Sequence, residues 1–144
     1  MSNKLPVKQK LKVVFDTNVY VAALLRPGLS EELVRRGLRG DFEVIICDEI
    51  LSELKSKLNK KFKFPKDKID NYIKLIKEKS MSYSIFRQLK VIKNDPGDDK
   101  ILECAIAGCA DLIISLDKDL LNLKKYQNIA ILHPKTFSWI IPEL

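Results

Sequence analysis

Residues 13–18 read VVFDTN, and this short stretch decides the expected fold. Its first three residues form a continuous apolar run, which is typical of a strand buried on both faces of a parallel sheet. Asp16 follows that run directly, and a helix is predicted over residues 18–25. In open α/β sheets, ligands bind outside the carboxyl ends of the strands, so this acid stands where a functional side chain is expected.

Strands and helices alternate along the rest of the chain. Further buried strands are predicted at residues 44–47, 112–116 and 129–132, and helices over 30–40, from Asp48, over 66–79 and 101–110, from Asp117 and from Pro134. This alternation predicts an α/β fold in three layers, α/β/α, with a central and mostly parallel sheet. Residues 82–85 and 90–92 are ambiguous, and residues 95–97 (Asp-Pro-Gly) predict a turn.

Length and composition limit the class of protein. A chain of 144 residues matches a single domain, so residues 1–144 are expected to form one unit. Apolar residues at 46% and charged residues at 31% exclude a disordered chain. The longest apolar run, residues 19–25, is far short of the ~20 residues that cross a bilayer, and the N-terminal residues lack the apolar stretch of a signal peptide. A cytoplasmic protein with no membrane segment is therefore expected.

Cysteine and histidine offer no catalytic or zinc-binding pattern. The three cysteines, Cys47, Cys104 and Cys109, have no ligand spacing, and the single histidine lies beside a proline. Zinc sites, disulfide frameworks and a Ser/His/Asp triad are all disfavoured, and the cysteines are expected to pack in the core.

The positive charge is concentrated in one segment. The chain carries a net charge of +7, and residues 55–79 alone contain ten lysines against three acidic residues. The rest of the chain is therefore neutral overall. A basic segment attracts polyanions such as nucleic acids through their phosphate charges. A solvated, lysine-rich surface is the alternative interpretation.

Acidic residues occur where the predicted strands end. Asp16 and Asp117 follow two strands directly, and Glu53 lies in the second turn of the helix after the strand at residues 44–47. Asp99 lies in the first turn of a helix that leads into a strand. On topological grounds that helix is expected to begin at the opposite edge of the sheet, so Asp99 would need an irregular loop or a tilted helix to join the others.

Such a cluster needs a cation. Two carboxylates about 6 Å apart repel each other by roughly 3 kcal/mol at an effective dielectric constant of 20. Four ionised carboxylates therefore cost on the order of 10–20 kcal/mol, which rivals the ~5–15 kcal/mol stability of a whole domain. Without cysteine or histidine ligands, an all-oxygen site suits Mg²⁺ or Mn²⁺. Because such ions activate water and stabilise the oxygens of a phosphodiester, a metal-dependent nuclease is the hypothesis.

Each acid also has a purely structural explanation. A carboxylate stabilises a helix N-terminus, directly or as an N-cap, and this alternative applies to Asp16, Asp98, Asp99 and Asp117. Glu53 is followed four residues later by Lys57, and an ion pair at this helical spacing is common on protein surfaces.

At these residues the sequence resembles the PIN-domain family, in particular the VapC-like toxins of prokaryotic toxin–antitoxin systems. Residues 13–18 resemble the opening signature of the family, a strand that ends in Asp-Thr/Ser-Asn. Residues 98–105 (DDKILECA) resemble its third-acid helix, and residues 112–119 (LIISLDKD) resemble its closing segment. Glu53, within residues 50–54 (ILSEL), matches the second acid with less sequence context. The resemblance runs from about residue 13 to residue 121.

The resemblance implies a PIN-like fold and a set of site residues. The acids that would hold Mg²⁺ or Mn²⁺ and serve catalysis are Asp16, Glu53, Asp99 and Asp117. The polar residues that would steady the acids or reach a phosphate are Thr17, Asn18 and Ser115. Asp98 is an alternative to Asp99 and Asp119 to Asp117, because a small shift in alignment would exchange them. The resemblance also implies that Asp99 does reach the carboxyl edge of the sheet.

The implied function is a metal-dependent endoribonuclease that is the toxin of a toxin–antitoxin pair. RNA is the implied substrate, and a small antitoxin and a second copy of the chain are the implied partners. The lysine-rich segment would then contact RNA through Lys57, Lys60, Lys61 and Lys63, with two phenylalanines, Phe62 and Phe64, that either stack on bases or pack in the core. Trp139 is expected in the core or an interface.

Two other functions stay open on sequence grounds. One is a PIN module that binds RNA or protein without cutting, and the other is an RNA-processing PIN nuclease outside toxin–antitoxin systems. Nucleotide-binding folds are disfavoured because the chain has neither a GxxxxGK[ST] nor a GxGxxG motif.

Overall fold

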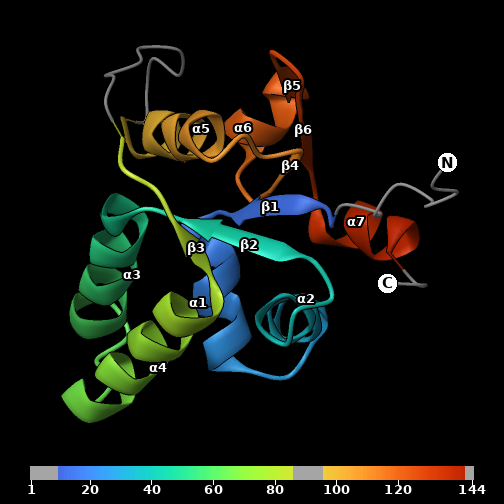
Figure 1. The fold of residues 1–144 in the computed structure, drawn as a ribbon. Helices are drawn as coiled ribbons and strands as arrows, with labels where there is room; N and C mark the ends of the chain where they lie inside the picture. Colours follow the sequence, from blue (N-terminus) through green and yellow to red (C-terminus); the bar gives the residue numbers. More distant parts are fainter. Residues whose placement is uncertain (1–9, 86–95, 142–144) are drawn as a thin grey trace, which may run out of the picture.

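Six strands form one sheet in the order β3-β2-β1-β4-β6-β5, and helices cover both of its faces (Figure 1). The computed structural model describes residues 10–85 and 96–141. The strands are β1 (Lys12–Phe15), β2 (Glu43–Ile46), β3 (Met81–Ser82), β4 (Leu112–Ile114), β5 (Lys125–Tyr126) and β6 (Ile129–Leu132). The helices are α1 (Thr17–Leu25), α2 (Leu29–Leu38), α3 (Asp48–Lys60), α4 (Lys66–Lys79), α5 (Pro96–Ala107), α6 (Lys118–Leu123) and α7 (Pro134–Ile140).

The sheet is parallel except at one edge. Strand β1 pairs in parallel with β2 and β4, and β4 pairs in parallel with β6. Among the strands of residues 10–85 and 96–141, only β5 and β6 pair antiparallel. Helices α1 to α4 lie on one side of the sheet and α5 lies on the other (Figure 1). The prediction of a three-layer α/β/α fold with a mostly parallel sheet is confirmed.

The central strands are apolar because both of their faces are covered. In β1 and β2 the last three residues are all buried, and they belong to the same core as the inward faces of the helices. A run of edge-to-face aromatic contacts, through Phe15, Tyr20, Phe42 and Phe137, continues this core from β1 towards α7. The continuous apolar runs of the sequence therefore mark the middle of the sheet.

The helix α5 corrects one expectation about direction. It was expected to begin at the sheet edge opposite to Asp16, but it begins at the same edge, beside the start of α3 (Figure 1). Lys100, in the first turns of α5, lines one cavity together with Asp48 and Glu53 of α3. The physical reason is that a helix leading into a parallel strand must return the chain to the start of that strand, so it runs antiparallel to the sheet and begins at the carboxyl edge.

Local details differ from the predictions at several helix and strand ends. Pro96 and Gly97, expected in a turn, belong to α5, because proline is tolerated in the first turn where its missing N–H group has no intrahelical acceptor. Asp48, expected as an N-cap, is the first residue of α3, after Cys47 at the cap position. The two-residue strand β5 was not predicted, and residues 90–92 and Asp95 lie outside the described residues.

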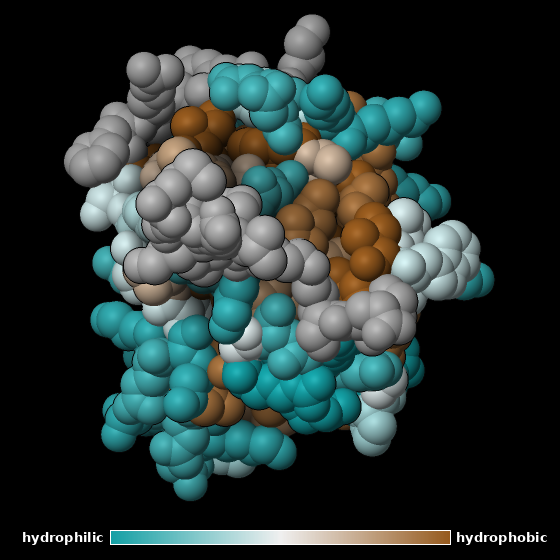
Figure 2. Space-filling view, turned by 45° about the vertical axis from the view of Figure 1, so that its right-hand side comes forward, coloured by the Kyte–Doolittle hydropathy of each residue, from teal (hydrophilic) through white to brown (hydrophobic). Residues whose placement is uncertain are grey.

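Some of the residues predicted to pack in the core are buried, and others are exposed. Cys47 and Cys104 are buried as expected, but Cys109 is exposed. Trp139, expected in the core or an interface, is 69% exposed, so it does not lie in the core. Its place in an interface stays a prediction. Phe62 and Phe64 are partly buried and pack against the core, which favours packing over base stacking. On the face that carries α7, apolar side chains gather in the upper half and hydrophilic ones dominate the lower half (Figure 2).

Gly37 allows α2 to approach the sheet closely. A Cβ atom at this position would lie 2.6 Å from Cγ2 of Val44 and 2.8 Å from Cε1 of Phe42. We expect Gly37→Ala to lower the free energy of unfolding by about 1–3 kcal/mol, the usual cost of overpacking, despite the better helix propensity of alanine. Urea denaturation measures the change. Glu32→Ala on the exposed face of α2 is the control, and a Gly37→Ala protein as stable as this control would contradict the close packing.

Candidate active site

The register of the two central strands places Asp16 beside Ser115. Phe15 of β1 pairs with Ile114 of β4, so the next residue of each strand leaves the sheet at the same point. The Ser115 hydroxyl donates a hydrogen bond of 2.8 Å to Oδ2 of Asp16, and the Asp117 N–H donates one of 3.0 Å to the same hydroxyl. Ser115 therefore joins the ends of both strands through one side chain.

Asp16 occupies the N-cap position of α1, but its side chain makes no conventional capping hydrogen bond. Only 5% of the residue is exposed, and its carboxylate is held inside the protein by the hydrogen bond from Ser115. The carboxylate also accepts a hydrogen bond from the N–H of Thr17, the first residue of α1. The structural alternative, an acid at a helix N-terminus, is therefore partly realised.

Glu53 comes to the same edge from α3. The buried Thr17, the first residue of α1, donates a hydrogen bond of 3.0 Å from Oγ1 to Oε2 of Glu53. Glu53 is close enough to Asp16 to raise the pKa of that acid by charge repulsion. The structure thus brings together two of the four predicted acids, with Thr17 and Ser115 each orienting one of them.

Lys57 lies against the two acids. Its Nζ is 3.3 Å from Oε1 of Glu53 and donates a hydrogen bond of 3.0 Å to Oδ1 of Asn18. The ion pair at helical spacing is therefore present, but Glu53 is not simply a surface acid, since Thr17 binds its other oxygen. The sequence predicted nucleic-acid binding for Lys57 and allowed its ion pair with Glu53, but it did not predict the contact with Asn18.

Burial determines the ionisation of Asp16. The pKa of Asp16 rises to about 6, chiefly because burial disfavours the charged form, and the negative charge of Glu53 adds to the rise. The hydrogen bonds from Ser115 and from the Thr17 N–H, together with the positive charge of Lys57, oppose the rise. Above about pH 6 the site thus holds an ionised carboxylate that is largely removed from water, which strengthens its attraction for cations.

The other two predicted acids are placed differently. Asp99 is buried, with 5% exposed, in the first turn of α5. Asp117 caps α6, since its Oδ1 accepts a hydrogen bond of 2.8 Å from the N–H of the exposed Asp119. The structural alternative for Asp117 is therefore realised, and Asp119 contributes its backbone to that cap. The side chain of Asp98 lies outside the described residues.

Glu103 is a buried acid that sequence reasoning did not select. It follows Asp99 by four residues on α5, and only 8% of it is exposed. Residues four apart lie on the same face of a helix. Two acids at this spacing on one face of a helix were the signal that could have identified Glu103.

The donor chemistry around Asp16 suits a hard divalent cation. Among residues 10–85 and 96–141, no group of three or more acidic, His or Cys side chains is close enough together to hold a metal ion. Mg²⁺ is nevertheless commonly bound by one or two carboxylates, keeping several waters and recruiting substrate phosphates. The carboxylate pair of Asp16 and Glu53 fits that pattern, whereas the convergence of all four acids stays a prediction.

A cavity of about 420 Å³ opens beside Glu53. It lies between the start of α3 and the first turns of α5, and it is lined by Asp48, Glu49, Ser52, Glu53 and Lys100. Acidic and basic side chains therefore line the same space. A polar cavity of this size can admit a phosphate group together with its waters.

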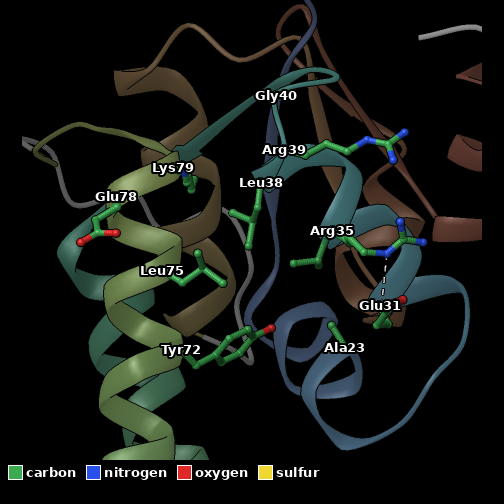
Figure 3. Close-up of a pocket in the computed structure, with 11 residues that line it drawn as sticks. Ala23, Glu31, Arg35, Leu38, Arg39, Gly40, Tyr72, Leu75, Glu78 and Lys79 are labelled. Atoms are coloured by element: carbon green, nitrogen blue, oxygen red, sulfur yellow. Dashed lines mark hydrogen bonds and ion pairs between the residues drawn. The ribbon is translucent and has the colours of Figure 1, made fainter.

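A second cavity, of about 770 Å³, lies between α2 and α4. Apolar side chains such as Ala23, Leu38 and Leu75 contribute to it, and an ion pair of 3.3 Å between Arg35 and Glu31 lies at one side (Figure 3). None of the predicted site residues lines it. Its apolar part suits a protein segment better than a hydrolytic reaction.

The comparison with known families decides the identity of this arrangement. The family model described as PIN domain matches residues 12–119, which include β1, α3, the start of α5 and the segment after β4. The chain belongs to the PIN-domain family. No curated protein matches the chain.

Two solved structures share the fold of this PIN domain. The crystal structure of VapBC2 from Rickettsia felis bound to a DNA fragment from their promoter matches with a TM-score of 0.60 and 13% identity, over 84% of this chain and 97% of that chain. The crystal structure of FitAcB from Neisseria gonorrhoeae matches with a TM-score of 0.54 and 14% identity, over 85% of this chain and 98% of that chain. At these identities the likeness concerns the fold. None of the described helices combines the length and apolar character that crossing a membrane requires.

The raised pKa of Asp16 predicts a characteristic pH dependence of stability. The folded state binds the proton more tightly than the unfolded state, whose Asp pKa is 3.8. The contribution of Asp16 to the free energy of unfolding therefore falls as pH rises from about 4 to above 6, by about 3 kcal/mol in total without divalent ions. Asp16→Asn cannot ionise and lacks this loss.

Urea denaturation of both proteins across that pH range measures the difference. Subtracting the two curves removes the other acids, which titrate in both proteins. We expect the wild type to lose stability relative to Asp16→Asn as pH rises. Two parallel curves would show that Asp16 is not a desolvated carboxylate.

Proposed function

We propose that this PIN domain is a divalent-metal-dependent endoribonuclease that acts as the toxin of a toxin–antitoxin pair. The observation that supports it most is the buried Asp16 carboxylate at the carboxyl edge, oriented by Ser115 and next to Glu53. The same edge carries Asp99, Asp117 and the polar cavity. The PIN-domain match covers all four acids.

Each residue has a role in the proposed reaction. Asp16 and Glu53 would hold Mg²⁺ or Mn²⁺, with Asp99 and Asp117 as the further acids of the site. When bound, such an ion supplies Lewis acidity towards the phosphodiester and lowers the pKa of water. Thr17 and Ser115 hold the carboxylates in place, so that the ligand oxygens need little reorganisation. Burial removes water that would otherwise weaken the attraction between the acids and the ion.

The proposal is tested by cleavage of single-stranded and structured RNA. We expect cleavage with Mn²⁺, loss of cleavage in excess EDTA, and a fall of about 100-fold or more for Asp16→Asn, which corresponds to about 3 kcal/mol of transition-state stabilisation. Asp67→Asn, an exposed acid of α4, is the matched control and should cleave normally.

Two outcomes of this assay would separate the alternatives. Cleavage that survives both EDTA and Asp16→Asn would eliminate the metal mechanism. Binding without cleavage on any RNA would favour a non-catalytic binding module.

Growth arrest on expression, relieved by Asp16→Asn, would distinguish a toxin from an RNA-processing nuclease of the same family.

RNA would approach along the lysine-rich end of α3. Lys57 lies at the acidic pair, and Lys60 follows it by about one helical turn. Lys61 and Lys63 continue the basic surface. The side chains of Lys60, Lys61 and Lys63 are exposed. Cations near the site attract the RNA backbone whatever its sequence. The nearby phenylalanines support this surface by packing beneath it, since the ammonium groups of Lys61 and Lys68 lie over the rings of Phe62 and Phe64.

A triple variant measures this contribution. Each lost phosphate contact lowers the slope of log affinity against log salt by about 0.7 for single strands, so replacement of Lys60, Lys61 and Lys63 by Gln is expected to lower it by about 2. A matched triple replacement of Lys124 at the end of α6, Lys125 on β5 and Lys135 on α7 should leave the slope unchanged apart from a small non-specific effect. Equal slopes for the wild type and for the variant at Lys60, Lys61 and Lys63 would show that this surface does not contact the RNA backbone.

An antitoxin is the protein partner that belongs to this proposal. The relative from Rickettsia felis was solved as VapBC2, bound to a DNA fragment from their promoter. The cavity between α2 and α4 supports a protein partner, since it offers apolar side chains between charged ones, the pattern that receives the apolar face of a helix. The homodimer rests on the resemblance alone and stays a prediction.

A further inference from the structure

Both carboxylate oxygens of Glu53 are already engaged within the chain. Oε2 accepts the hydrogen bond from Thr17, and Oε1 faces the ammonium group of Lys57 at 3.3 Å. The hydroxyl contact orients the carboxylate, but the ammonium contact supplies positive charge. The side of Glu53 that could bind a metal ion is therefore the side that Lys57 occupies.

Lys57 differs from its neighbour on the same helix. The side chain of Lys57 is 33% exposed and makes two polar contacts, at 3.0 Å with Asn18 and 3.3 Å with Glu53. The side chain of Lys55 is 59% exposed, and its closest carboxylate, Asp70, is 3.9 Å away. A lysine held by two contacts across two helices has a defined position, whereas a lysine like Lys55 is mostly in solvent.

The position of this ammonium group conflicts with a divalent ion on Glu53. Two cations that approach the same carboxylate repel each other, and the repulsion is strong where water is partly excluded. The ammonium group of Lys57 has a second partner besides Glu53, because Oδ1 of the exposed Asn18 accepts a hydrogen bond from it. Its long flexible stem allows it to leave Glu53 without movement of α3.

We propose that Lys57 is a resident counter-cation of the Asp16–Glu53 pair, which a divalent ion displaces from Glu53, and that the displaced ammonium group then binds a backbone phosphate of the RNA. This inference rests on the proposed function and deepens it. It explains how two neighbouring carboxylates stay folded together before metal binds. It also gives one lysine two successive roles, as a positioning residue for Glu53 and as a phosphate contact.

The first test is the affinity of each variant for Mn²⁺ alone, measured by isothermal titration calorimetry at about pH 8. Removal of the competing charge in Lys57→Met is expected to tighten Mn²⁺ binding about tenfold. Lys57→Arg keeps the charge and should bind Mn²⁺ like the wild type. Lys55→Met, two residues away on α3 at a lysine whose ammonium group lies 3.9 Å from Asp70, should also be unchanged. Circular dichroism confirms that each variant is folded.

The second test separates the two roles of Lys57 through the kinetics of RNA cleavage at saturating Mn²⁺. Loss of the phosphate contact in Lys57→Met should raise KM several-fold and change kcat much less. The inference therefore predicts opposite signs: tighter metal binding and weaker RNA binding in one variant. A purely structural role would weaken both together.

The outcomes distinguish this inference from the function on which it rests. Mn²⁺-dependent cleavage by the wild type, with equal or weaker Mn²⁺ affinity in Lys57→Met, would overturn the inference and leave the nuclease intact. A wild type that binds no Mn²⁺ would overturn both. Tighter Mn²⁺ binding in Lys57→Met with an unchanged KM would show that Lys57 does not contact an RNA phosphate. The proposed transfer of its ammonium group from Glu53 to the RNA would then be wrong.

Discussion

The structure depends on one constraint: a carboxylate is buried at the point where two parallel strands end side by side. Burial of a charge is costly, and the raised pKa of Asp16 has that burial as its chief cause. Hydrogen bonds from Ser115 and the Thr17 N–H, and the charge of Lys57, offset only part of it. A divalent ion would offset the remainder, so the strain at this residue and the proposed chemistry have the same origin.

Much of the fold was predictable because the physical signals are local. Continuous apolar runs mark strands buried on both faces, and their alternation with amphipathic helices implies parallel pairing. The position of Asp16 at a strand end followed from the same pattern. Its environment did not, because it depends on the register of β1 against β4, which sets Ser115 beside it and cannot be read from either strand alone.

The remaining differences have separate causes. The direction of α5 was predicted wrongly, although a helix that leads into a parallel strand must begin at the carboxyl edge of the sheet, and the resemblance to the PIN-domain family implied that edge for Asp99. Glu103 was not predicted, although it lies four residues after Asp99 on the same face of α5 and is buried. Trp139 was expected in the core or an interface and does not lie in the core, because composition alone does not determine which apolar side chains of the short helix α7 face solvent.

The central claim is that the buried carboxylate and its neighbour form a cation site, and diffraction at the manganese absorption edge tests it most directly. A crystal grown with Mn²⁺ should show an anomalous peak within coordination distance, about 2.0–2.3 Å, of carboxylate oxygens of both Asp16 and Glu53, with the Lys57 ammonium group moved off Glu53. A peak only at surface acids, or none beside Asp16 in a crystal saturated with Mn²⁺, would contradict the account.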